Sequence, residues 1–113
     1  MSVVSIRSHK RFAVCHDVSL RSSSGKPVDG MLIEVSKGGC RISNLGHNEY
    51  ELGHQLAVQV AGFEEFLGRV RWSRQGMVGL CFSRPLHGSC LDRLIRFCRG
   101  ELEPADSPRR ANG

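Results

Sequence analysis

The stretch GRVRWSRQGMVGLCF, residues 68–82, reads as the core of a hairpin. Residues 63–73 alternate in the manner of a strand, residues 74–76 (Arg-Gln-Gly) suit a tight turn, and residues 77–83 return as the partner strand. One face of the first strand carries Phe66, Gly68, Val70 and Trp72, opposite Leu67, Arg69 and Arg71. We expect Trp72 to pack inside the fold, because a large aromatic ring is usually buried against apolar neighbours.

Four further runs, residues 11–20, 28–35, 40–43 and 55–61, also read as strands. Their predicted inward faces are Phe12, Val14, His16, Val18 and Leu20 in the first run, Met31, Ile33 and Val35 in the second, and Leu56, Val58 and Val60 in the last. Polar segments rich in turn-forming residues separate the runs. Six strands at short, regular spacing predict a small barrel or sandwich.

The end of the folded region reads as one helix. Ser89 and Asp92 resemble a capping box, and Gly100 suits the C-terminal cap. The apolar stripe consists of Leu91, Leu94, Ile95 and Cys98. A helix of about three turns is not stable alone, so we expect this stripe to cover a barrel opening. We expect residues 1–5 to be a flexible N-terminus, residues 6–100 to be the domain, and residues 101–113 to be a disordered tail.

The composition favours a globular protein with an anionic partner. The chain has 113 residues and a formal net charge of +5, and Arg supplies 13 of its 16 basic residues. A basic surface with no specific partner accounts for the charge equally well. Five cysteines lack metal-ligand spacing, so we expect buried, reduced thiols and no metal site. Neither a signal peptide nor a membrane span is evident, so we expect a cytoplasmic protein without membrane association.

Two polar motifs carry the functional interpretation. Arg7 and Arg11 are four residues apart, and guanidinium groups bind guanine edges and phosphates with paired hydrogen bonds. The second motif is EVSKGG, residues 34–39, which supplies a carboxylate, a hydroxyl and two glycines that allow unusual dihedral angles and close backbone approach. Taken singly, the first motif is better explained as a solvated basic segment and the second as an ordinary hairpin turn.

Together, Arg7-x-x-x-Arg11 and Glu34-x-Ser36-x-x-Gly39 resemble the paired motifs of the PilZ domain family, and residues 68–82 are similar to its closing hairpin. The resemblance covers residues 6–99 and implies a six-stranded antiparallel β-barrel with one C-terminal α-helix that binds the bacterial second messenger cyclic di-GMP. The implied ligand-binding residues are Arg7, Arg11, Glu34, Ser36, Gly38 and Gly39. Arg7 and Arg11 would hold guanine and phosphate, Ser36 and Gly39 would shape the floor, and residue 34 would meet a guanine edge. The family has Asp or Asn where this chain has Glu34, so we expect weaker binding than with Asp.

We therefore expect a single-domain cyclic di-GMP receptor, a monomer or weak dimer, whose N-terminal arginine arm becomes ordered on binding and which acts in trans on an unidentified protein partner. The alternative is an adaptor of the same fold that has lost nucleotide binding, which Glu34 favours. A third interpretation, a barrel that binds single-stranded nucleic acid, requires more stacking aromatics than one Trp and one Tyr. No catalytic pattern is present, so we expect neither enzyme activity nor a cofactor.

Overall fold

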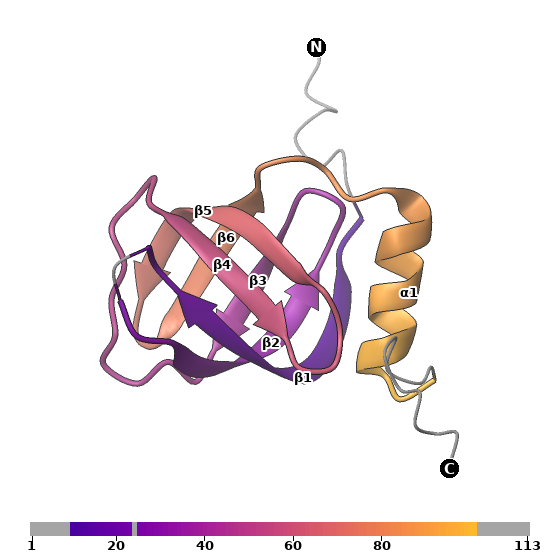
Figure 1. Cartoon of the computed structure of the whole chain (residues 1–113), viewed down its shortest axis with the longest axis horizontal. Coiled ribbons are helices and arrows are strands. Elements are labelled where there is room, and N and C mark those ends of the chain that lie inside the picture. The colour runs from indigo at the N-terminus through magenta and orange to yellow at the C-terminus, as the bar shows by residue number, and fades with distance from the viewer. Residues whose placement is uncertain (1–9, 24, 102–113) are drawn as a thin grey trace.

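Six antiparallel strands close into a barrel in the computed structural model, which describes residues 10–23 and 25–101 (Figure 1). The strands are β1 (Phe12–Arg21), β2 (Val28–Val35), β3 (Gly39–Ser43), β4 (Gln55–Val60), β5 (Glu65–Arg74) and β6 (Met77–Phe82). Their order around the barrel is β1-β2-β3-β6-β5-β4. One helix, α1 (Gly88–Cys98), lies at one end of the barrel. This architecture confirms the predicted fold.

Bulges interrupt the pairing of three strands. They lie between Ala13 and His16 in β1, between Leu32 and Glu34 in β2, and between Val70 and Trp72 in β5. A bulge adds a residue to one strand and changes the face on which the following side chains lie. The period-two expectation fails in β2 and near the end of β5. In β1 the predicted inward face is confirmed, since Val14, Val18 and Leu20 are buried.

The bulge in β2 corrects the predicted inward face of that strand. Leu32 and Val35, at 1% and 0% exposure, are its buried residues. Met31 and Ile33, predicted to point inward with Val35, are only partly buried, and the Met31 sulfur accepts a hydrogen bond from the exposed Cys15 thiol at 3.2 Å. The extra residue opposite β3 breaks the alternation that the prediction assumed.

The barrel interior and the inner face of α1 form one apolar core. The buried helix residues are Leu91, Leu94, Ile95, Phe97 and Cys98, which confirms the predicted stripe and adds Phe97 to it. Burial of this face supplies the tertiary support that so short a helix needs.

The N-terminal cap of α1 differs from the predicted one, whereas the C-terminal cap agrees with the prediction. The N-cap is His87 without a side-chain hydrogen bond, so the predicted capping box is wrong, because Ser89 already lies within the first helical turn. At the other end Gly100 has φ of +78°, its N–H donates to Phe97 at 3.0 Å, and the N–H of Glu101 donates to Arg96 at 2.7 Å. This pair of bonds is a Schellman motif and confirms the predicted glycine cap.

The helix is attached to the start of β1. The Arg99 guanidinium donates a hydrogen bond to the carbonyl oxygen of Ala13 at 2.8 Å. The rings of His16 and Phe97 meet edge to face with centroids 5.0 Å apart. The last turn of α1 therefore contacts the part of β1 that directly follows Arg11.

The cysteines differ in their surroundings. Cys40 and Cys98 are buried, and burial raises the pKa of the Cys40 thiol to about 12 and the pKa of the Cys98 thiol to about 11. Cys15 and Cys81 are exposed, so the expectation of uniformly buried thiols is wrong for these two, because both lie at outward positions of their strands. No helix in the described part of the chain has the length and apolarity needed to cross a membrane.

Candidate ligand-binding site

The turn between β2 and β3 is organised by the hydroxyl group of Ser36. This residue is 9% exposed, and its Oγ accepts hydrogen bonds from the N–H groups of Gly38 and Gly39, both at 3.2 Å. The hydroxyl also donates to the Gly39 carbonyl at 3.4 Å, and the Ser36 N–H donates to the same oxygen at 2.9 Å. The hydroxyl therefore fixes the loop from within, as in other Ser/Thr turns.

The same turn lies against β6. A Cβ atom at Gly39 would overlap the carbonyl oxygen of Leu80, and the Phe82 N–H donates to the Gly38 carbonyl at 2.8 Å. The predicted close backbone approach at Gly39 is thus confirmed. Unusual dihedral angles are not found, since neither Gly38 nor Gly39 is among the glycines with positive φ.

Glu34 lies between two arginines. One carboxylate oxygen is 3.1 Å from Nε of Arg11, and the other is 3.6 Å from a terminal nitrogen of Arg41. Both contacts follow from strand pairing, because Glu34 lies opposite Ala13 on β1 and opposite Arg41 on β3. Sequence reasoning missed Arg41, although a hairpin closed at residues 36–39 places it opposite Glu34. Arg7, the partner of Arg11 in the first motif, lies outside the described residues.

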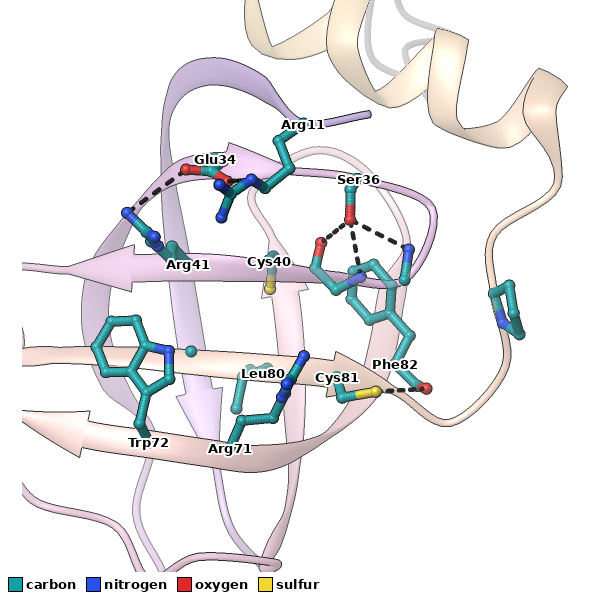
Figure 2. Close-up of a pocket in the computed structure, with 14 residues that line it drawn as sticks. Arg11, Glu34, Ser36, Cys40, Arg41, Arg71, Trp72, Leu80, Cys81 and Phe82 are labelled. Carbon is teal, nitrogen blue, oxygen red and sulfur yellow. Dashed lines mark hydrogen bonds and ion pairs between the residues drawn. The ribbon is translucent and has the colours of Figure 1, made fainter. Parts of the chain in front are cut away.

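An open pocket of about 360 Å³ lies over β3 and β6 on the outer surface of the barrel (Figure 2). Arg11 and Glu34 stand at one margin, and Arg71 and Trp72 of β5 stand at the other. Five of the six residues proposed from the motifs line it: Arg11, Glu34, Ser36, Gly38 and Gly39. The fold therefore brings Arg11 of the first motif and the residues of the second motif to a single concave surface.

Trp72 belongs to this outer surface and not to the core. It is half-buried, and its indole occupies the space above Gly79, where a Cβ atom would overlap the ring. The guanidinium carbons of Arg41 and Arg74 lie 5.7 and 5.3 Å from the ring centre. The expectation that Trp72 packs inside the barrel is wrong, because the bulge in β5 turns this side chain outward.

The sequence matches the PilZ domain family over residues 5–100, and the chain belongs to that family. PilZ domains are binding and adaptor modules, and they are generally receptors for cyclic di-GMP. Among solved structures, the chain is similar to the Bacillus subtilis inhibitor of motility, MotI/DgrA, with 17% identity and a TM-score of 0.59. That alignment covers 83% of this chain and 50% of the other, so this chain spans half the length of its structural neighbour. No curated protein matches the sequence.

Proposed function

We propose that this protein is a cyclic di-GMP receptor that acts on a protein partner in the bacterial cytoplasm. The observation that carries the proposal is the placement of Arg11 and the residue 34–39 turn around one pocket, in a chain of the PilZ family. The ligand has two phosphodiesters and two guanines. The guanidinium group of arginine suits both, because it forms paired hydrogen bonds with phosphate oxygens and with the O6 and N7 atoms of guanine.

The pocket residues fall into complementary roles in this proposal. Arg11, with Arg7 from the segment ahead of it, binds phosphate and guanine. The carboxylate of Glu34 accepts hydrogen bonds from guanine N–H groups, and Ser36 holds the floor in shape through its contacts with Gly38 and Gly39. The indole of Trp72 offers a stacking surface at the opposite margin.

Binding changes the protein by ordering the N-terminal arm against the barrel. The ligand then biases a conformational equilibrium by the free energy of its contacts with the ordered arm. The hydrogen bond from Arg99 to the Ala13 carbonyl supports a route from the arm to α1, since Ala13 is two residues from Arg11. The partner recognises the surface formed by the ordered arm and the neighbouring end of the barrel.

Calorimetric titration with cyclic di-GMP tests the proposal. Arg11→Ala removes one charged donor, and a charge-assisted hydrogen bond is worth about 1.5–3 kcal/mol, so Kd should rise roughly ten- to a hundred-fold. Arg93→Ala, which removes an exposed arginine of α1 outside the pocket, is the matched control and should leave Kd unchanged. Absence of heat with the folded wild-type protein at millimolar ligand would refute the proposal.

One observation favours the second candidate, an adaptor that has lost nucleotide binding. Glu34 holds both Arg11 and Arg41, and a ligand must compete with this carboxylate for their donors. The same titration separates the candidates. An adaptor gives no heat with the nucleotide, and its interaction with a partner is insensitive to cyclic di-GMP.

A further inference from the structure

The bulge in β5 places Arg71 in the pocket. Val70 pairs with Leu80 and Trp72 pairs with Gly79, so two consecutive residues of β6 face three residues of β5. Arg71 is the additional residue. Its exposed side chain lines the pocket next to that of Trp72, although neighbouring residues of a regular strand point to opposite faces. Bulges often redirect side chains in this way beside binding sites.

Arg71 differs electrostatically from the other arginines that line the pocket. Arg11 and Arg41 share the carboxylate of Glu34, so these three groups together carry a net charge of about +1. Arg71 has no carboxylate within ion-pair distance in the part of the chain that the structure describes. Its guanidinium therefore offers all of its donors to an incoming anion.

The glycine amides of the pocket floor do not provide a competing anion site. The N–H groups of Gly38 and Gly39 both donate to Ser36 Oγ within the turn. A phosphodiester in the pocket therefore finds its hydrogen-bond donors among the guanidinium groups and not among these two amides. Of the pocket arginines, Arg71 needs no ion pair to be broken before it binds.

We propose that Arg71 is a further ligand-contacting residue, which binds a phosphodiester of cyclic di-GMP from the wall opposite Arg11. The inference rests on the proposed function and adds a contact that lies outside both sequence motifs. Arg11 enters the pocket from the segment before β1, whereas Arg71 rises from β5 toward β6, as Figure 2 shows. A ligand with two phosphodiesters is thereby held from both margins, beside the ring of Trp72.

Arg69 provides a matched control for Arg71. It lies two residues earlier on the same strand, is exposed on the same outer surface, and pairs with Cys81 of β6, but it does not line the pocket. Like Arg71, it has no ion-pair partner within the described residues. The two alanine variants therefore remove the same charge from the same strand, but only the side chain of Arg71 lines the pocket.

The experiment is calorimetric titration of wild type, Arg71→Ala, Arg71→Lys and Arg69→Ala with cyclic di-GMP at low and moderate salt. Fluorescence of the single tryptophan, Trp72, serves as a second readout. Arg71→Ala should raise Kd at least ten-fold and flatten its salt dependence, as loss of a phosphate contact does. Arg71→Lys should recover part of the affinity, since lysine keeps the charge without the fork. Arg69→Ala should change Kd less than two-fold.

Each outcome decides the question. If wild type binds and Arg71→Ala binds equally well, or loses no more affinity than Arg69→Ala, the inference about Arg71 is overturned while the proposed function stands. If folded wild type does not bind, the proposed function fails and the inference fails with it. Thermal melting of each variant verifies that only folded proteins are compared. If Arg71→Ala does not fold, the affinity of Arg71→Lys decides, and a Kd equal to that of wild type overturns the inference.

Discussion

The hydroxyl of Ser36 supports a quantitative prediction, because its hydrogen bonds all lie within the turn that it organises. Ser36→Ala leaves the N–H groups of Gly38 and Gly39 without their acceptor. A buried donor left unpaired costs about 1–3 kcal/mol. Since the turn borders an open pocket, water can reach part of it, and we expect a total loss of about 1–2 kcal/mol in the free energy of unfolding.

That loss corresponds to a measurable change in melting temperature. For a domain of about 100 residues, 1 kcal/mol shifts the melting temperature by about 4 °C, so Ser36→Ala should melt about 4–8 °C lower than wild type. The affinity for cyclic di-GMP should fall as well, because ligand binding must then also order the turn. In Ser36→Ala the ligand thus loses the ordered turn against which it binds, and it loses no direct contact with the hydroxyl.

Calorimetry and urea denaturation measure both effects. Ser83→Ala is the control, because Ser83 is exposed just after β6 and its hydroxyl has no hydrogen bond within the described residues. The control should match wild type in stability and affinity. If Ser36→Ala melts within about 1 °C of wild type while its affinity drops, the hydroxyl contacts the ligand directly and the reasoning given for the turn is refuted.

Three further predictions concern other parts of the molecule. Glu34→Asp should bind cyclic di-GMP about two- to five-fold more tightly in titration, because the shorter side chain releases arginine donors whose partly exposed ion pairs are each worth about 0.2–1 kcal/mol; unchanged or weaker binding contradicts this. Arg99→Ala should lose about 1 kcal/mol of stability in urea and expose the amides of α1 to faster hydrogen exchange, because its bond to Ala13 is removed; unchanged exchange contradicts this. Because burial raises the pKa of Cys40 from 9.0 to about 12, the unfolded chain loses this proton first. The free energy of unfolding should thus fall as the pH rises above about 9, and less steeply in Cys40→Ala, whereas equal slopes above that pH contradict the prediction.

The sequence was sufficient to place the six strands along the chain, the helix and the turn at residues 36–39, because these follow from local periodicity and turn chemistry. It was misleading at Met31, Ile33 and Trp72, where bulges reverse the face of a side chain. A bulge depends on pairing between distant strands, and no period within one strand reveals it. Arg71 was therefore assigned to the surface opposite Trp72, although the two lie together in the pocket. Arg41 was overlooked because its meaning comes from its position opposite Glu34.

The pocket lies on the outside of a closed barrel, and its floor and rim are built from different kinds of residue. The floor depends on Gly39 and Gly79, where any added side chain collides with Leu80 or Trp72, so substitutions there disturb folding and binding together. The rim consists of long polar side chains such as Glu34 and Arg71, which reach the pocket from the barrel surface without entering the core. Ligand preference can consequently diverge among descendants of this protein through rim substitutions, while the barrel beneath stays folded throughout.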